Sequence, residues 1–499
     1  MRTSTGSGLW SAMQTGDSKT ENGAVTHSTS NSASVDFFFK IGALRGAAED
    51  MIINAFWKAF NTNPLIAMRI LFYARDVRGG QGERRVFRTI LKTLANGGPS
   101  SEWLKQNLAC IPTYGRFDDL FELVGTPLQN EALSFYGVAL QAGDGLAAKW
   151  APREKSSKAN VATLLRKHMG LTPKAYRKML VTSTDVVENK MCAQQWDTIE
   201  FSSVPSCAMR IYRKAFERNC KTYAQYIQNL AAGNEKVNSS TLYPHQIVRS
   251  IGAASSPEEK ILLNEMWNSL PDYLEGNQRN ILPIIDTSGS MTTPIAKGSE
   301  SCMDVSVGLG MYLAERNRGI FRDKFITFSS TPSLQDVQGE NLWNRVQSIQ
   351  SASWGMSTNL KAVFDLILQA AVSNNIKSDE MPEMVLIISD MEFDVANRDY
   401  DHGRTNYHAT NANVINSEYQ RLGYKAPDLV FWNVQARSDA NVPVKHNELG
   451  VALVSGFSPS IMKQLLSTES LTPESIMMSV VSSDRYSAVR APEESEVSL

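Results

Sequence analysis

The sequence lacks the patterns of several protein classes. No stretch approaches the roughly 18 uninterrupted apolar residues that a membrane-spanning helix needs, and residues 1–8 contain no apolar block of the kind found in a secretory signal. The five cysteines are odd in number and none belongs to a Cys-x-x-Cys pair, which argues against a disulfide framework and against a zinc finger. We therefore expect a cytoplasmic protein with reduced thiols and no contact with a membrane.

The chain also lacks a large net charge of either sign. Its 499 residues contain 50 Lys plus Arg and 51 Asp plus Glu, a net charge of -1. This balance hides a split, because residues 36–280 carry 31 basic and 23 acidic groups (net +8), whereas residues 281–499 carry 17 and 26 (net -9). The length corresponds to roughly two to four domains. Halves of opposite charge predict domains with different partners.

The N-terminal half has a helical pattern. Residues 1–35 contain few large apolar groups and predict a disordered or loosely held arm. From residue 36 to 275, apolar residues recur at helical spacing in amphipathic stretches, with no strand-like alternation. We expect an all-helical domain there, with helix pairs stacked as in HEAT repeats. This domain carries the basic excess.

The C-terminal half alternates short apolar strands with helices. Strands are expected at 281–286, 325–328, 384–388, 429–434 and 451–454, and helices at 302–316, 340–350, 359–373, 411–421 and 459–467. Continuously apolar strands separated by helices predict a doubly wound, mostly parallel α/β sheet. We place this domain at residues 276–470. Residues 471–499, rich in Ser and Glu, predict a mobile tail.

Polar side chains follow the ends of the expected strands. Asp286, Ser288 and Ser290 come directly after the first strand, Asp390 closes the most apolar strand, and Thr358 lies in an intervening loop. In a doubly wound sheet, ligands bind outside the carboxyl ends of the strands. Two carboxylates and three hydroxyls without His or Cys suit a hard divalent cation, with Mg²⁺ favoured over Mn²⁺ or Ca²⁺.

Two other interpretations exist for this motif. The Ser and Asp side chains could simply cap the turns between strands and helices, as in a vestigial site. The sequence Asp286-Thr287-Ser288-Gly289 also looks superficially like the Asp-Thr-Gly-Ser loop of aspartic proteases. That chemistry needs glycine directly after Asp-Thr and paired carboxylates on β-rich lobes, and the alternation of strand with helix argues against it.

The five residues together resemble the metal-ion-dependent adhesion site (MIDAS) of the von Willebrand factor A domain. The matching pattern is Asp-x-Ser-x-Ser at 286, 288 and 290, the loop threonine at 358 and the strand-end aspartate at 390, over about residues 280–465. The resemblance implies a Rossmann-like fold in which Ser288, Ser290 and Thr358 contact the metal directly, while Asp286 and Asp390 act through water. One departure is Met391-Glu392, because many family members have Gly after the last aspartate.

The densest charge in the sequence lies between residues 149 and 178, where nine basic residues stand against Glu154 alone. The nine are Lys149, Arg153, Lys155, Lys158, Arg166, Lys167, Lys174, Arg177 and Lys178. Such a patch can neutralise RNA phosphates without reading sequence, and the interleaved Trp150 and Tyr176 are candidates for stacking on bases. The alternative is an ordinary solvated face of loop and helix.

A second basic feature is a glycine-rich segment. Residues 75–85 read Arg-Asp-Val-Arg-Gly-Gly-Gln-Gly-Glu-Arg-Arg. Three glycines ahead of a helix could present backbone N–H groups to a phosphate, flanked by Arg75, Arg78, Arg84 and Arg85. The segment is not a P-loop, since no Gly-Lys-Ser/Thr follows. A plain turn between helices with Arg–Asp pairs is the alternative.

The arrangement of the two halves provides a second resemblance. A helical domain containing Arg-Asp-x-Arg-Gly-Gly-x-Gly, joined to a C-terminal von Willebrand A-like domain, is similar to the Ro/TROVE ribonucleoproteins and closer to less characterised relatives of the same layout. Residues 114–120, 196–199 and 204–206 support the same resemblance. The resemblance implies binding of small structured or misfolded RNA; a ring of helical repeats follows by analogy only.

These observations predict a non-catalytic, cytoplasmic RNA-binding protein whose von Willebrand A-like domain holds a divalent metal for contact with a ligand or protein. The alternative is a metal-dependent protein-interaction or assembly module with no nucleic-acid role. A hydrolase is the third interpretation, and only the oxygen-rich motif favours it. A lone histidine, His245, follows Pro244 and is expected to be structural.

Overall fold

The computed structural model describes residues 18–19, 25–295, 300–328, 332–352, 360–391, 418–434, 442, 446–447, 450–468 and 471–490. Their contacts define two compact units that are interleaved along the sequence. The first, which we call the sheet unit, takes residues 1–47, 205–214 and 223–480. The second, which we call the helical unit, takes residues 48–204, 215–222 and 481–499.

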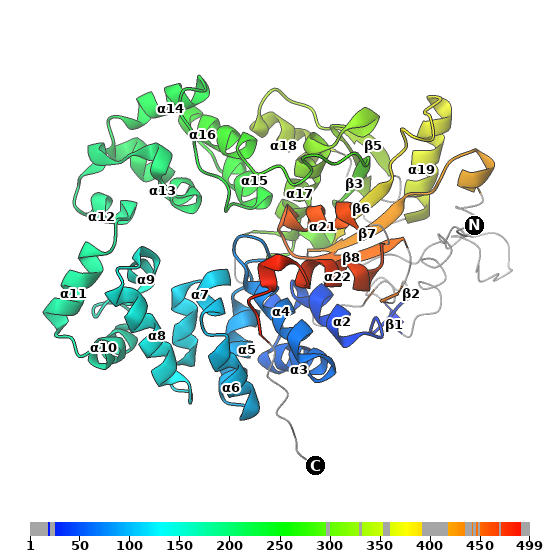
Figure 1. The fold of residues 1–499 in the computed structure, drawn as a ribbon. Helices are drawn as coiled ribbons and strands as arrows, with labels where there is room; N and C mark the ends of the chain where they lie inside the picture. The colour runs from blue at the N-terminus through cyan, green and yellow to red at the C-terminus, as the bar shows by residue number, and fades with distance from the viewer. Residues whose placement is uncertain are drawn as a thin grey trace, which may run out of the picture. The chain divides into compact units, whose positions relative to one another are not determined.

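The sheet unit is built on six strands in the order β5-β4-β3-β6-β7-β8 (Figure 1). The strands are β3 (Ile281–Asp286), β4 (Lys324–Phe328), β5 (Ser333–Asp336), β6 (Met384–Ser389), β7 (Asp428–Asn433) and β8 (Val451–Ser455). Every neighbouring pair is parallel except β4 and β5. This confirms the mostly parallel α/β fold expected from the apolar strands. The short antiparallel edge strand β5 was not expected, because its residues are only half-buried or exposed.

Helices of the sheet unit come from both sequence halves. They are α2 (Ala33–Lys40), α14 (Tyr223–Ala231), α15 (Pro244–Gly252), α16 (Pro257–Asn268), α17 (Cys302–Arg316), α18 (Leu342–Gln350), α19 (Leu360–Ser373), α21 (Met462–Ser467) and α22 (Pro473–Val481). Helix α15 packs on α17 at Gly308, where an added Cβ would lie 2.7 Å from the backbone N of His245. Helix α13 (Ser206–Asn219) contributes residues to both units.

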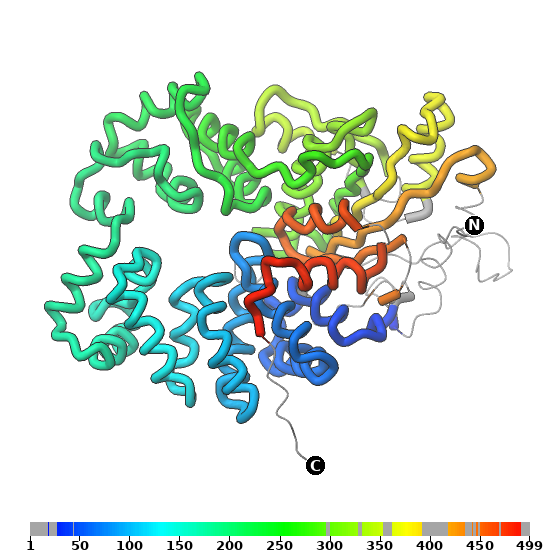
Figure 2. The backbone as a smooth tube through the Cα atoms, viewed as in Figure 1, coloured from blue at the N-terminus to red at the C-terminus, as the bar shows by residue number. Residues whose placement is uncertain are grey.

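The helical unit is an array in which helices that are close in the sequence pack on one another (Figure 2). Its helices are α3 (Glu49–Thr62), α4 (Pro64–Arg75), α5 (Arg85–Ala95), α6 (Pro99–Gln106), α7 (Cys110–Tyr114), α8 (Gln129–Gln141), α9 (Gly145–Trp150), α10 (Ala159–His168), α11 (Pro173–Thr182) and α12 (Val187–Cys192). Several of these helices begin at a residue whose side chain caps the first turn. The Asn63 side chain accepts the N–H of Ile66 at 3.0 Å ahead of Pro64, as N-caps do. The all-helical character expected between residues 36 and 275 is confirmed.

The structure differs from the sequence prediction at the C-terminus. Residues 473–481 form α22, and the segment that follows is packed, because Tyr486 is 1% exposed and Val489 is 2% exposed. The apolar residues of this segment are therefore core residues, and residues 471–490 are not a mobile tail. The residues beyond 490 lie outside the described part of the chain.

None of the described helices combines the length and the apolar character that a membrane span requires.

Candidate functional site

The two aspartates predicted as metal ligands lie at adjacent strand ends. Asp286 is the last residue of β3, and Asp390 directly follows β6. The two strands are parallel neighbours with Ile285 opposite Ile388, so their carboxyl ends are level. The chain continues from β3 to β4 on one side and from β6 to β7 on the other. This is the topological switch point at which doubly wound sheets bind ligands.

Hydrogen bonds fix the oxygens at this position. Asp286 is 1% exposed; its Oδ1 accepts the N–H of Ser288 at 2.9 Å, and its Oδ2 accepts the hydroxyl of Ser389 at 2.5 Å. The hydroxyls of Ser288 and Ser290 lie 3.0 Å apart. The first turn after β3 therefore brings one carboxylate and two hydroxyls together, as the spacing 286, 288 and 290 predicted.

The electrostatics favour a cation. Burial, and then the negative charge of Asp390, raise the pKa of Asp286 to about 6, while hydrogen bonds from Ser389 and Ser288 act in the opposite direction. Two carboxylates held near one another in a buried place repel each other, and a divalent cation removes that repulsion. The described residues contain no group of three or more His, Cys, Asp or Glu that could hold a metal. A metal here would accordingly depend on the serine hydroxyls, which suits a hard cation.

The sequence departure after Asp390 has a backbone consequence. Met391 adopts a φ of 65°, in the left-handed region that favours glycine. Its N–H donates to the Ser389 hydroxyl at 3.1 Å, and its side chain is 6% exposed. The loop therefore takes the glycine conformation with methionine in place, and its buried side chain offsets part of the strain. Thr358 and Glu392 lie outside the described residues.

Most of the basic residues of segment 149–178 face solvent. The exposed ones are Arg153, Lys155, Lys158, Lys167, Lys174, Arg177 and Lys178. Lys149 is half-buried, and Arg166 is held by Glu154 at 2.8 Å and by the Leu171 carbonyl at 2.7 Å. The prediction that Tyr176 could stack on bases is wrong, because it is 1% exposed and its hydroxyl donates to the Pro152 carbonyl. The position of Tyr176 on helix α11 directs its ring into the core.

The glycine-rich segment is a turn whose N–H groups are already used. The Asp76 carboxylate accepts the N–H of Arg78 at 3.0 Å and of Gly79 at 3.1 Å, and the Asp76 carbonyl accepts those of Gly80 and Gly82. An added Cβ at Gly80 would lie 2.0 Å from the Tyr73 carbonyl oxygen, so the glycine serves a close approach. The phosphate-cradle interpretation is therefore wrong, and the interhelical turn is correct.

The arginines flanking this turn divide into buried and exposed groups. Arg75 is 2% exposed and its Nε donates to Asp119 at 2.8 Å, so it is no surface contact. Arg78, Arg84 and Arg85 are exposed.

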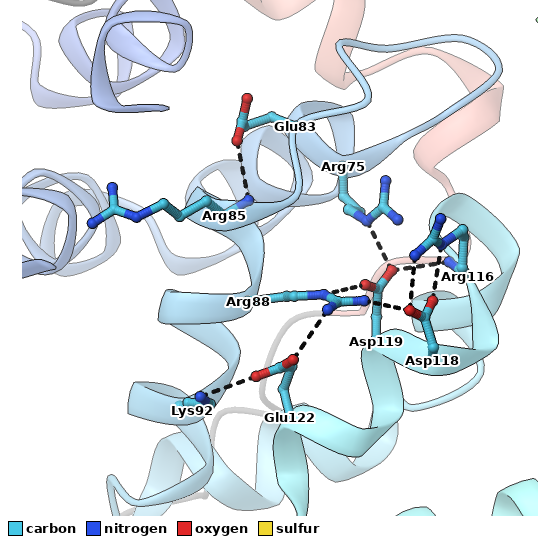
Figure 3. Close-up of polar contacts among 9 residues, drawn as sticks. All are labelled: Arg75, Glu83, Arg85, Arg88, Lys92, Arg116, Asp118, Asp119 and Glu122. Atoms are coloured by element: carbon cyan, nitrogen blue, oxygen red, sulfur yellow. Dashed lines mark hydrogen bonds and ion pairs between the residues drawn. The ribbon is translucent and has the colours of Figure 1, made fainter. Parts of the chain in front are cut away.

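Two arginines that sequence reasoning missed, Arg88 and Arg116, complete the cluster in Figure 3. Arg88 contacts Asp119 at 2.7 Å, Asp118 at 2.8 Å and Glu122 at 3.2 Å, and Arg116 binds both oxygens of Asp118 at 2.8 Å. The acidic pair at 118–119 was the available signal, because buried carboxylates require cationic partners.

Comparisons with known proteins follow the two sequence halves. A family model described as "Domain of unknown function (DUF2828)" matches residues 20–134 and 154–277, and one described as "Domain of unknown function (DUF7788)" matches residues 280–497. Uncharacterized protein L728 of Acanthamoeba polyphaga mimivirus is 30% identical over 518 residues, which covers 93% of this chain and 86% of that protein. The crystal structure of the Deinococcus radiodurans RO (RSR) protein matches with 12% identity and a TM-score of 0.44, over 91% of this chain and all of that chain.

Proposed function

This chain, which contains the DUF2828 and DUF7788 regions, belongs to the family of the mimivirus protein L728, and we propose that it is a cytoplasmic, non-catalytic RNA-binding protein. The single observation that carries the proposal is the exposed basic surface of the helical unit. None of its seven exposed cations between Arg153 and Lys178 forms an ion pair with another described residue. Small structured or misfolded RNA is the ligand class that the sequence resemblance implies.

The physical argument rests on the excess of charge. Exposed lysines are common on protein surfaces, but a segment with nine basic residues and one acidic residue repels itself in the absence of counterions. An RNA backbone replaces these counterions and releases them to solution, which makes binding favourable and strongly dependent on salt. The half-buried Trp150 beside Lys149 adds an aromatic surface.

Replacing Lys155, Lys158, Lys167 and Lys174 together with Glu should weaken RNA binding by roughly 100-fold at about 0.1 M salt and make the salt dependence shallower by about 3 units of slope. Arg166 is left unchanged because it is bound to Glu154. The measurement is fluorescence anisotropy of a labelled RNA hairpin with a single-stranded tail, across a range of KCl concentrations.

The matched control reverses four exposed lysines elsewhere: Lys58, Lys221, Lys236 and Lys377. It changes the net charge by the same amount, so it should reproduce only the small loss of RNA affinity that the change of net charge itself causes. If the two variants lost equal RNA affinity, the basic surface would not be the RNA-binding site. A wild type that binds no RNA would overturn the proposed function.

We infer in addition that Asp286, Ser288, Ser290 and Asp390, with Thr358 as the remaining candidate ligand, hold Mg²⁺ or a similar divalent cation. The support is the buried pair of carboxylates beside two hydroxyls at the switch point. Such a site would let the sheet unit contact an acidic group of a ligand or protein. A metal-dependent protein-interaction module remains the second candidate function, and this pair is the observation that favours it.

Titration of the chelator-treated protein with Mn²⁺, followed by electron paramagnetic resonance, tests the metal site. One tightly bound ion per chain is expected, and Asp286→Asn should weaken its binding by about 10- to 100-fold, the usual cost of removing a carboxylate that orients a site. Asp336→Ala, at an acid of the edge strand β5 that lies away from the strand-end motif, is the control and should bind as the wild type does. Equal binding by Asp286→Asn would show that the ion lies elsewhere.

A further inference from the structure

One exposed arginine of the helical unit stands apart from the ion pairs around it. Arg84 directly precedes α5, and no hydrogen bond or ion pair of its guanidinium joins it to another described residue. Partial burial lowers its pKa, the positive charges of Arg116, Arg88 and Arg75 lower it further, and the negative charge of Asp118 acts in the opposite direction. The Arg84 carbonyl accepts the N–H of Arg88 at 3.0 Å, which places Arg84 one helical turn before the arginine that binds Asp118 and Asp119. An anion would be stabilised beside this exposed cation.

The neighbouring arginines are fixed by three carboxylates (Figure 3). Arg75 and Arg88 contact Asp119, Arg88 and Arg116 contact Asp118, and Arg88 and Lys92 contact Glu122. With Arg84, the cluster holds five cations (75, 84, 88, 92 and 116) against three anions (118, 119 and 122), an excess of two positive charges. The carboxylates position the guanidinium groups without neutralising the cluster.

Arg116 links this cluster to the basic segment that begins at Lys149. Its guanidinium lies 3.8 Å from the ring centroid of Trp150, and the Lys149 ammonium lies 5.8 Å from the same ring. Because Nε and Nη2 of Arg116 bind Asp118, Nη1 is the donor that Asp118 does not engage. The two basic features that are far apart in the sequence therefore meet at Arg116 and Trp150.

We propose that Arg84, Arg116 and Trp150 form a nucleotide-binding site for single-stranded RNA. A phosphate binds between the guanidinium groups of Arg84 and Arg116, and the adjoining base stacks on the face of the half-buried Trp150 ring opposite Arg116. The site joins the flanks of the glycine-rich turn to the exposed cations between Arg153 and Lys178 in one RNA-binding surface. This inference rests on the proposed function and adds the class of ligand: a single-stranded segment with an unpaired base.

Three properties of the geometry favour this ligand. Guanidinium groups suit phosphate because their planar donors match its oxygens. Asp118 fixes Arg116 in advance, so little side-chain freedom is lost on binding. An aromatic ring beside a phosphate site is the arrangement by which proteins bind single strands, since every base has a face that can stack.

The test uses the full-length chain and a fluorescein-labelled oligouridylate, measured by anisotropy at several KCl concentrations. Arg84→Ala should weaken binding roughly 5-fold at about 0.1 M salt and make the slope shallower by about 0.7, the effect of one lost phosphate contact on a single strand. Trp150→Leu should weaken binding by at least roughly 5-fold with no change of slope, because stacking releases no counterions. Trp150→Tyr keeps a ring and should restore most of the affinity, which separates stacking from misfolding.

Arg322→Ala, at an exposed arginine of the sheet unit, is the control and should bind as the wild type does. If reversal of the four lysines weakens RNA binding as expected while Arg84→Ala and Trp150→Leu leave it unchanged, the nucleotide site is wrong and the RNA-binding function stands. If the wild type does not bind, both fail. Equal binding of a labelled oligoglutamate peptide, lost in the same variants, would assign the site to acidic peptides and overturn the proposal.

Discussion

Replacing Asp76 with alanine is expected to lower the free energy of unfolding of the helical unit by about 2–3 kcal/mol, the usual cost of leaving buried hydrogen-bond donors without their acceptor. The cost stays below that of a fully buried ion pair because the Arg485 side chain is 40% exposed and water can solvate its charge. The Asp76 side chain is fully buried. It binds the guanidinium of Arg485 through Nε and through Nη2, the latter at 2.6 Å, and accepts the Tyr486 hydroxyl at 3.0 Å. Alanine would leave the Arg485 charge without its partner and free the N–H groups of the turn at 78–79.

The same substitution should release the C-terminal segment from the helical unit. Residues 481–490 are held there by a few further contacts, including the hydrogen bond from the Tyr114 hydroxyl to the Arg485 carbonyl at 2.6 Å and that from the Arg490 N–H to Asn107 at 2.9 Å. Hydrogen exchange measured by mass spectrometry should therefore show faster exchange in peptides covering residues 69–82 and 481–490 together. Local opening of this kind reports the stability of the segment directly.

Glu131→Ala is the matched control for Asp76→Ala. Glu131 forms an ion pair with Lys105 at 3.4 Å in the same unit, but both side chains are partly exposed. Such pairs contribute about 1 kcal/mol or less. If Asp76→Ala and Glu131→Ala gave the same exchange rates and the same urea midpoints, Asp76 would not be the anchor of the C-terminal segment.

The strand-end site was predictable because its signals are local. Each strand is a short apolar run, and the polar residues that end β3 and β6 follow without a gap. The helix expected at 302–316 is α17, with the same bounds, because Ser301 and Asp304 form a capping box at its start. What the pattern alone did not supply was the adjacency of β3 and β6, which came from the resemblance to the von Willebrand A domain.

The anchor at Asp76 was not predictable, because its partners lie far away in the sequence. Arg485 is 409 residues from Asp76, and no local pattern links them. A Ser- and Glu-rich composition therefore predicted a tail, although a few apolar residues and one ion pair are enough to pack it. The glycine-rich turn was misread for a related reason: the carboxylate beside it satisfies the N–H groups that a phosphate would need.

The sequence also misled the prediction of which single side chains are exposed. Arg75 and Tyr176 belong to basic stretches, yet both point into the core, Arg75 toward Asp119 and Tyr176 toward the Pro152 carbonyl. Charge counted along a segment cannot tell which face of a helix each residue occupies. The RNA-binding proposal depends instead on the exposed cations between Arg153 and Lys178.

Acid is expected to destabilise the sheet unit through His245. This histidine is 1% exposed, stacked on Tyr243 at 5.7 Å and packed edge-on against Phe457 at 5.0 Å. Burial, and then the positive charges of Arg45 and Arg210, lower its pKa from 6.5 to about 3. The unfolded chain is therefore protonated at His245 below about pH 6.5, whereas the folded chain is not protonated there until the pH falls to about 3. Its contribution to stability falls by about 1.4 kcal/mol per pH unit across that window, on the order of 5 kcal/mol in all.

Asp286 acts with the opposite sign in metal-free protein. Its pKa is raised from 3.8 to about 6, so the folded chain binds a proton between about pH 6 and pH 4 that the unfolded chain does not, and stability rises as pH falls through that range. The two slopes are of similar size, so they cancel over those two units. In the wild type, the summed contribution of His245 and Asp286 to the free energy of unfolding should therefore change little between about pH 6 and pH 4. Below about pH 4 that contribution should fall.

Urea unfolding in the presence of a chelator, at about pH 7, 5.5 and 4.5, separates the two groups. His245→Phe keeps an aromatic ring between Tyr243 and Phe457 and removes the titration, so this variant should gain stability as the pH falls from 6 to 4. Asp286→Asn removes the opposing group and should lose stability over the same range, at about 1.4 kcal/mol per unit. Because opposite slopes are expected from two substitutions in one unit, general acid denaturation cannot mimic the result, and parallel slopes would show that His245 does not control it.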